Sequence, residues 1–239
     1  MLKVNFGGVV SISTLDWRGK SSSVVFFSGC NFRCPYCQNH KIVDKVDWKD
    51  IDIIKKGIYQ SIDFISAVVF SGGEPTIQVD ALLDLAKFSK DQDLLVGIET
   101  NGCYPHVLRK LAKKNLVDKI FLDIKAHLLD DDKYRKITGG IIDANKQVIK
   151  SLKIENVDIE PRTTIFRSTL DDILPIAKYL KDNGYDTYIL QQGIPENAPN
   201  QEIRKESRVP IKEMEKIAKN ISSLVGINVK AIEGKDYDI

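Results

Sequence analysis

The sequence predicts an α/β protein built as a partial (β/α)6 TIM-like barrel with a C-terminal extension. Six short apolar runs alternate with amphipathic segments, which is typical of parallel βαβ units whose sheet is covered by helices. Polar residues follow the ends of these runs, and in a barrel such ends share the face that carries active sites. Six units are too few for a closed eight-stranded barrel. An open doubly wound sheet, the other arrangement considered, would also bind ligands at strand ends.

The elements follow in order along the chain. Residues 4–18, broken by Gly7 and Gly8, predict a turn or hairpin before the first main strand. Continuous apolar runs predict strands at 24–27, 67–70, 94–98, 119–122, 157–159 and 185–190. Apolar residues at helical spacing predict helices at 50–60, 77–88, 107–114, 141–152 and 171–181. Thr169 is the expected N-cap of the last of these helices.

The pattern breaks after Gln192. Residues 193–210 are rich in Pro, Asn and charge and predict a long loop. A helix over 211–225 and a short strand over 227–232 follow. The sequence therefore predicts a barrel core of residues 1–192, with residues 193–239 packed on it as an extension.

Composition fits a soluble globular enzyme, with 43% hydrophobic and 28% charged residues among 239. The formal net charge of +2 gives no reason to expect nucleic-acid or membrane binding. No apolar run approaches the roughly 18 residues that span a bilayer. The N-terminus lacks the apolar region and cleavage site of a signal peptide, so we expect an intracellular, cytoplasmic protein.

Three of the four cysteines lie in residues 29–39, GCNFRCPYCQN, with the spacing C-x3-C-x2-C. Cysteine thiolates hold iron–sulfur clusters, and three of them would leave the fourth iron of a cubane cluster open. The alternative is structural zinc, which requires four N or S ligands. His40 or Cys103 could supply the fourth, but the chain has a single C-x2-C pair. The spacing of Cys30, Cys34 and Cys37 therefore favours a [4Fe-4S] cluster.

With Tyr36 and Asn39 added, the loop reads C-x3-C-x-Y-C-x-N and resembles the cluster loop of the radical S-adenosylmethionine (SAM) superfamily. SGGEP at 71–75 resembles the GGE motif of that superfamily. ETNG at 99–102 and LDIK at 122–125 resemble its glycyl-radical-enzyme activases. Opening with NFGGVVSISTLDWRGKSSSVVFFSGCNFRCPYCQN at 5–39, the sequence is most similar to activating proteins of anaerobic ribonucleoside-triphosphate reductase, and pyruvate formate-lyase activases are close relatives. The resemblance implies S-adenosylmethionine docked at the open iron.

The resemblance also implies which side chains surround that cofactor. Paired glycines let a backbone approach a ligand closely, and the 72–74 edge is implied to bind the methionyl ammonium. Lys125 and Arg162 are candidates for its carboxylate. The full expected cofactor-binding set is Tyr36, Asn39, Gly72, Gly73, Glu74, Thr100, Asn101, Lys125, Arg162 and Gln191. The structural alternatives are a tight turn at GGE and an ion pair between Arg162 and Glu160.

Acidic side chains at neighbouring strand ends could bind a hard cation through oxygen. Resemblance to the formate-lyase activases implies a monovalent cation held by Glu99, Thr100, Asp123 and the carbonyl of Phe121. Those proteins often carry Asp where this chain has Glu99. The alternative is that these groups form salt bridges within the barrel.

The implied reaction is reductive cleavage of S-adenosylmethionine to methionine and a 5′-deoxyadenosyl radical, which removes hydrogen from a glycine Cα of a partner enzyme. The partner expected is a glycyl-radical enzyme, with anaerobic ribonucleoside-triphosphate reductase as the leading hypothesis. The expected electron donor is a flavodoxin or ferredoxin. Two alternatives remain open: a radical enzyme acting on a small molecule or a formate-lyase-type partner, and a zinc-stabilised binding module without catalysis.

Overall fold

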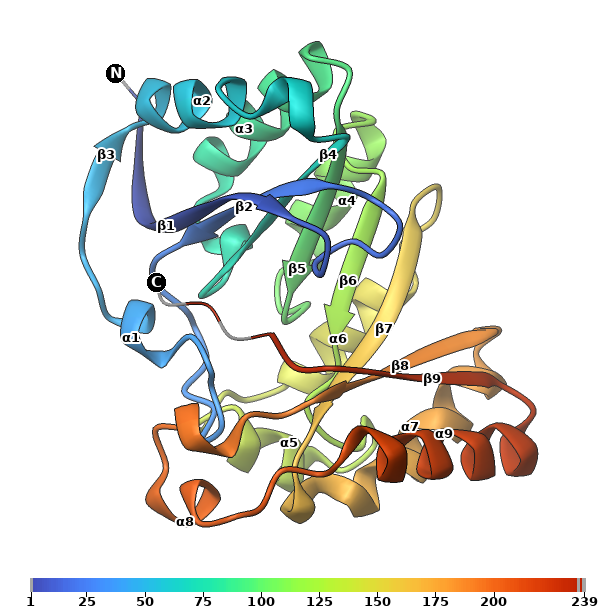
Figure 1. Cartoon of the computed structure of the whole chain (residues 1–239). Coiled ribbons are helices and arrows are strands. Elements are labelled where there is room, and N and C mark those ends of the chain that lie inside the picture. The colour runs from blue at the N-terminus through green and yellow to red at the C-terminus, as the bar shows by residue number, and fades with distance from the viewer. Residues whose placement is uncertain (1, 236, 238–239) are drawn as a thin grey trace.

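The computed structural model describes residues 2–235 and 237. Its strands form one nine-stranded sheet in the order β3-β1-β2-β4-β5-β6-β7-β8-β9. Neighbours from β2 to β9 are parallel, whereas β1 is antiparallel to both β2 and β3. The sheet curves strongly, with helices packed along its outside (Figure 1). The expected α/β partial barrel is confirmed.

The strands are β1 (Lys3–Ser13), β2 (Ser22–Phe27), β3 (Trp48–Asp50), β4 (Ala67–Gly72), β5 (Leu95–Thr100), β6 (Lys119–Asp123), β7 (Asp158–Ile165), β8 (Thr187–Gln192) and β9 (Asn228–Ile232). The α-helices are α1 (His40–Val43), α2 (Ile51–Tyr59), α3 (Val79–Asp91), α4 (Pro105–Lys113), α5 (Asp131–Ile137), α6 (Ala144–Leu152), α7 (Ile173–Asp182), α8 (Gln201–Arg204) and α9 (Ile211–Val225). The longer predicted helices and strands are all present. The short elements α1, β3, α5 and α8 were not predicted. No helix in the described part of the chain is long and apolar enough to span a membrane.

Alternate residues of the buried strands pack on opposite faces of the sheet. Val25 and Phe27 of β2 join the large apolar core between the sheet and the helices. Val24 and Phe26 face the concave side, where they form a second cluster with Phe121 of β6. Because both faces are buried, the strands read as continuous apolar runs.

The N-terminal segment forms the expected hairpin, since β1 pairs antiparallel with β2. A register shift falls between Phe6 and Gly8, so one long strand continues through the glycines instead of ending there. At the other end of the sheet, β9 pairs in parallel with β8. The C-terminal extension therefore contributes a seventh parallel strand to the sheet.

Two sequence predictions near β7 were wrong. The strand runs to Ile165, because Arg162, Thr163 and Thr164 keep pairing with β8 although they are polar. Arg162 consequently lies within the strand and not beyond its end. Thr169 lies inside a 3-10 turn (Arg167–Asp172), where its hydroxyl accepts a hydrogen bond from the amide of Phe166 (2.9 Å). It does not cap α7, which starts at Ile173.

Candidate active site

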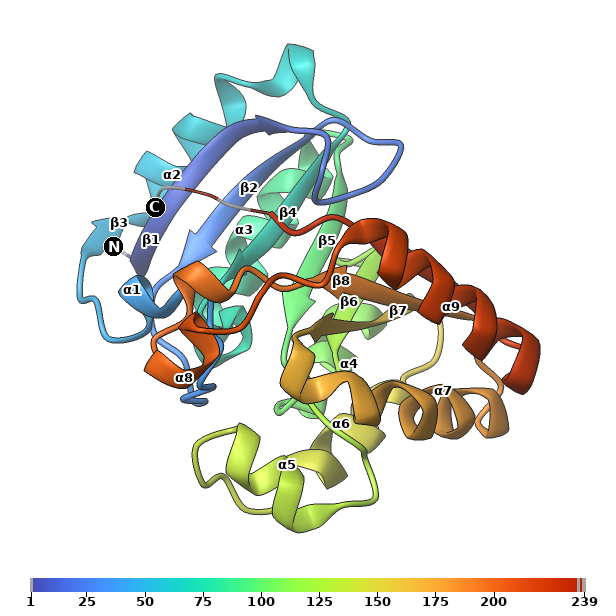
Figure 2. The ribbon, with the colours of Figure 1, turned by 60° about the horizontal axis from the view of Figure 1, so that its bottom comes forward.

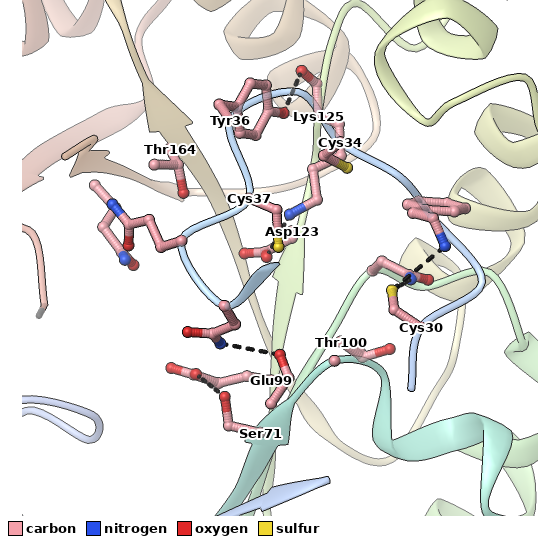
Figure 3. A pocket seen from close by; sticks show the side chains of 17 residues that line it. Cys30, Cys34, Tyr36, Cys37, Ser71, Glu99, Thr100, Asp123, Lys125 and Thr164 are labelled. Atoms are coloured by element: carbon pink, nitrogen blue, oxygen red, sulfur yellow. Dashed lines mark hydrogen bonds and ion pairs between the residues drawn. The ribbon is translucent and has the colours of Figure 1, made fainter. Parts of the chain in front are cut away.

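One pocket lies on the concave side, at the carboxyl ends of the parallel strands. The loop that follows β2 and the ends of β4, β5, β6, β7 and β8 build its wall (Figures 2 and 3). The residues that line it are Cys30, Phe32, Cys34, Tyr36, Cys37, Gln38, Asn39, Ser71, Gly72, Gly73, Glu99, Thr100, Asn101, Asp123, Lys125, Thr164 and Gln191. The structure therefore gathers all three loop cysteines and most of the predicted cofactor-binding residues in one cavity.

The cysteine loop is tied to the sheet by main-chain contacts. The amide of Gly73 donates to the carbonyl of Phe27 (2.8 Å), and that of Glu74 donates to the carbonyl of Gly29 (2.9 Å). Further along the loop, Asn39 donates from its side chain to the carbonyl of Gly72 (2.9 Å). Both ends of the loop are thus fixed against the end of β4.

Gly72 and Gly73 pack closely against the main chain where β2 leads into the cysteine loop, which leaves no room for a Cβ at either position. A Cβ on Gly73 would lie 1.9 Å from the carbonyl oxygen of Gly29, and one on Gly72 would lie 2.4 Å from that of Phe27. Gly72 also has a φ of +116°, a conformation that side chains disfavour. Glycine at these positions lets β4 and the cysteine loop touch. Both residues also line the pocket, where the ligand approach expected from the sequence stays a prediction.

The three thiols lie along the pocket wall and face different parts of it (Figure 3). Burial raises the pKa of Cys30 and of Cys34 to about 12, and it also raises that of Cys37. Burial therefore favours the protonated, neutral form of all three thiols. Metal binding to thiolates releases their protons, so the pocket needs a cationic centre to hold all three ionised. Among the described residues, no three His, Cys, Asp or Glu side chains converge as ligands of one ion.

The candidate fourth zinc ligands lie apart from the pocket wall. His40 places Nδ1 3.2 Å from the carbonyl oxygen of Cys37 and not at its thiol. The amide of Cys103 donates to the side chain of Asn101 (3.0 Å). Neither His40 nor Cys103 is among the described residues that line the pocket.

The ammonium group of Lys125 places a positive charge near the thiols of Cys34 and Cys37. The ammonium lies 2.7 Å from Asp123 Oδ2, and its charge lowers the thiol pKa values of Cys34 and Cys37 against the effect of burial. Tyr36 donates its hydroxyl to the carbonyl of Lys125 (3.3 Å) and stacks on Phe166 with ring centroids 5.0 Å apart. The aromatic ring thereby fixes the turn between the last two cysteines.

Glu74 lies directly behind the pocket wall and is fully buried. Its Oε1 accepts hydrogen bonds from the amide and hydroxyl of Thr76 and from the hydroxyl of Thr100 (2.8 Å). Its Oε2 accepts the amide of Asn101 (2.7 Å). The side-chain amide of Asn101 in turn lies 3.9 Å from the sulfur of Cys30. Glu74 therefore anchors Thr100 and Asn101 of the wall, and it is not itself among the described residues that line the cavity.

Glu99 sits where the sequence placed a cation ligand, and side chains of the protein already neutralise it. Its Oε1 accepts from Arg162 (3.0 Å) and Lys235 (2.5 Å), and its Oε2 accepts from Ser71 (2.7 Å). Burial raises the pKa of Glu99, but the charges of Lys235 and Arg162 outweigh it and bring the pKa to about 2. Salt bridges within the barrel, the alternative to a cation site, are thus present at Glu99.

Arg162 is part of the same interior network and is absent from the pocket lining within the described residues. Its Nε donates to Glu160 (2.7 Å), and its guanidinium lies over the ring of Phe121 at 3.9 Å. The structural ion pair considered for Arg162 and Glu160 is therefore formed. The side chain acts on the pocket through Glu99.

Several lining residues escaped the sequence prediction. Phe32, Gln38, Ser71 and Thr164 all line the cavity. Ser71 precedes Gly72 at the end of β4, and Thr164 lies near the end of β7, so strand-end position is the signal that could have identified them. Lys235 could not have been found in this way, because it follows the last strand by three residues.

Comparisons with known proteins agree with this geometry. Residues 24–198 match the family model of the radical SAM superfamily. A protein of Methanocaldococcus jannaschii, provisionally described as a glycyl-radical enzyme activating enzyme, is 37% identical over 231 residues, 91% of this chain and 93% of that protein. Pyruvate formate-lyase-activating enzyme of Clostridium pasteurianum is 35% identical over 127 residues, 49% of this chain and 50% of that enzyme.

Among solved structures, Streptococcus suis SuiB bound to its precursor peptide SuiA superposes with a TM-score of 0.66 at 14% identity, covering 87% of this chain and 48% of SuiB. That likeness concerns the fold. The sequence match to the Methanocaldococcus jannaschii protein goes further, because it covers 91% of this chain at 37% identity. The chain belongs to the radical SAM superfamily and, within it, to the glycyl-radical-enzyme activating enzymes, which are oxidoreductases.

Proposed function

We propose that this enzyme activates an anaerobic ribonucleoside-triphosphate reductase by generating a glycyl radical on it. The observation that carries the proposal is the single pocket in which three cysteines of the loop after β2 meet polar side chains from five strand ends. The N-terminal sequence supports the choice of partner. A pyruvate formate-lyase-type enzyme is the alternative partner.

Membership in the superfamily implies a [4Fe-4S] cluster and S-adenosylmethionine. The donor set fits the cluster, because the pocket presents three thiols and no fourth cysteine among the described lining residues. We propose that Cys30, Cys34 and Cys37 ligate it. When bound, cluster and cofactor together supply a 5′-deoxyadenosyl radical that can take hydrogen from a glycine Cα.

The protein's own contribution is orientation and charge. We propose that Lys125 pairs with a carboxylate of the cofactor, and its position in the cavity lining, where its charge acts on Cys34 and Cys37, supports this role. Gly72 and Gly73 also line the cavity, and we propose that their main-chain carbonyls accept hydrogen bonds from the ammonium of the cofactor. Thr100 and Asn101 are held in place by Glu74. These groups, with Tyr36, Asn39 and Gln191, form the proposed cofactor-binding surface.

A monovalent cation remains part of the proposal at the end of β6. Asp123 lines the pocket and pairs with Lys125, so a cation there would have to share or replace that ammonium. Glu99 is the weaker ligand candidate, because two protein cations already occupy one of its oxygens.

The test is anaerobic incubation of the reconstituted enzyme with the reductase from the same genome, S-adenosylmethionine and reduced flavodoxin or ferredoxin. We expect methionine and 5′-deoxyadenosine in the presence of reductant, and a glycyl-radical resonance on the reductase. Cleavage of the cofactor with no radical on either candidate partner would favour the small-molecule alternative. Purified protein with one zinc and no sulfide would overturn the radical chemistry altogether.

A further inference from the structure

The chain returns after β9 to the opposite end of the sheet. We call its described residues there, Glu233, Gly234, Lys235 and Tyr237, the C-terminal strap. Although β9 is the strand farthest from β1 in the sheet order, the trace after β9 runs back across the concave side toward β1 and β2 (Figures 1 and 2). The strap therefore spans the gap that the incomplete barrel leaves open.

Two strap side chains reach the far side of this gap. The ammonium of Lys235 lies 2.9 Å from Asp16 and 2.5 Å from Glu99. The hydroxyl of Tyr237 donates to Asp16 (2.5 Å) and lies 3.0 Å from that of Ser13. Asp16 is 1% exposed and Lys235 8% exposed at their side chains, so the closed strap seals these charges from water.

The strap is held by side chains alone in the described part of the chain. The ladder between β8 and β9 ends at the pair of Gln191 and Ile232. Beyond it, the amide of Gly234 meets only the side chain of Gln192, at 3.5 Å. Release of the strap would thus break side-chain contacts, the ion pairs of Lys235 among them, and leave the sheet intact.

Ring packing adds one apolar contact. Tyr237 packs edge-on against Phe26 of β2, with ring centroids 5.6 Å apart. Phe26 belongs to the concave-side cluster, so the strap covers apolar surface that its release would expose. Glu99, the strap's contact at the pocket, lines the cavity itself. The strap thereby contacts both the β1–β2 hairpin and one residue of the proposed site.

We propose that the strap occupies the surface on which the polypeptide substrate docks, and that substrate binding displaces it. The inference rests on the proposed function, because only a macromolecular substrate needs this opening. Helices cover the outer face of the sheet (Figure 1), which leaves the concave gap as the route for a peptide segment. If only molecules with an open strap bind the partner, the apparent Kd equals the Kd of the open form divided by the fraction of molecules that are open. The closed strap therefore weakens binding.

The first experiment measures hydrogen exchange by mass spectrometry in the intact protein. Replacing Tyr237 by Ala removes the hydroxyl contacts and the ring, while Tyr59→Ala, at an exposed residue of α2, is the matched control. We expect Tyr237→Ala alone to accelerate exchange in residues 13–17 and 233–235 roughly tenfold or more, with α9 unchanged. Equal exchange in both variants would show that the strap covers nothing.

The second experiment adds the reductase from the same genome. Exchange of residues 233–235 in the unsubstituted enzyme should rise on binding, and Tyr237→Ala should bind the reductase about tenfold more tightly. Slower strap exchange in the complex, or equal affinities, would overturn displacement. Tyr237→Phe keeps the ring and should give an intermediate affinity, which guards against misfolding of the Ala variant.

Failure of the proposed function has a different signature. Cofactor cleavage without a radical on the reductase, in the unsubstituted enzyme and in both Tyr237 variants, would refute the choice of partner. In that case, hydrogen exchange of residues 13–17 in the absence of the reductase still tests the strap. Faster exchange in Tyr237→Ala than in the unsubstituted enzyme would show that the strap covers these residues. Tyr237 does not line the pocket in the described structure, so uncoupled cofactor cleavage serves as the common reference for all variants.

Discussion

Glu74 offers the sharpest test of how the pocket wall is built. Replacing it by Ala leaves two main-chain donors, the amides of Thr76 and Asn101, without their buried acceptor. Each buried unpaired donor costs about 1–3 kcal/mol, and the void left by the side chain adds to this. We expect Glu74→Ala to lower the free energy of unfolding by about 4 kcal/mol.

Glu74→Gln separates charge from shape. One amide oxygen can keep the bonds from Thr76 and Thr100, but the new NH2 group then faces the amide of Asn101, donor against donor. The expected loss is about 2 kcal/mol, half that of the Ala variant. The exposed Glu155→Ala variant is the control and should stay within about 0.5 kcal/mol of the unsubstituted protein.

The assay is urea and thermal unfolding of the metal-free protein, followed by circular dichroism without oxygen. For a chain of this size about 4 kcal/mol corresponds to a shift of the midpoint by roughly 10 °C. Affinity for S-adenosylmethionine in the reconstituted protein is the second readout. A Glu74→Ala variant within about 1 kcal/mol of the unsubstituted protein, but unable to bind the cofactor, would refute the buried anchor and indicate direct contact.

Three further predictions address the thiols, the interior network and the glycine contact. Cys34→Ala should abolish cluster iron and cofactor cleavage, whereas Cys103→Ala should retain the iron; normal iron in the first variant would remove Cys34 from the ligand set. The pKa of Glu99 is about 2, below the unfolded value of 4.5, so its stabilisation is present above pH 4.5 and disappears as pH falls toward 2. Metal-free protein should therefore lose about 2 kcal/mol more than a Glu99→Gln variant between pH 6 and pH 3, and parallel urea midpoints would contradict this. Gly73→Ala would place a Cβ 1.9 Å from the carbonyl oxygen of Gly29 and should lower both the stability and the bound iron. The control, Gly57→Ala, meets open space in α2 and should stabilise the protein by about 0.5–1 kcal/mol. Equal effects of the two substitutions would show that the contact between Gly73 and Gly29 relaxes freely.

The sequence predicted the barrel well because its strands are buried on both faces and its long helices have one apolar stripe each. The helix expected at 211–225 was found at Ile211–Val225. Polar residues inside a strand misled the prediction at β7, because Arg162 and Thr163 are buried and pair with β8 although neither is apolar. The apolar run at 157–159 marks only the start of β7, whereas the most buried residues of the strand, 161–163 and 165, include polar ones.

At the site, local motifs predicted which residues gather, and long-range contacts decided what they do. Spacing was sufficient for Cys30, Cys34 and Cys37, which line one pocket. The buried position of Glu74, by contrast, depends on Asn101, 27 positions further along the chain. The partner of Glu99 is separated from it by 136 positions, and no local pattern encodes such a pair.

The contact between Gly73 and Gly29 has a consequence for loading of the cluster. Main-chain hydrogen bonds fix the loop before any iron binds. Cluster binding therefore does not have to order a flexible loop, and the affinity for the cluster is not reduced by the conformational entropy that such ordering would cost. Because the sheet holds the cysteine loop, the loop should also move little when the bound cluster is reduced by one electron. Such a site combines easy cluster assembly with a small structural response to reduction.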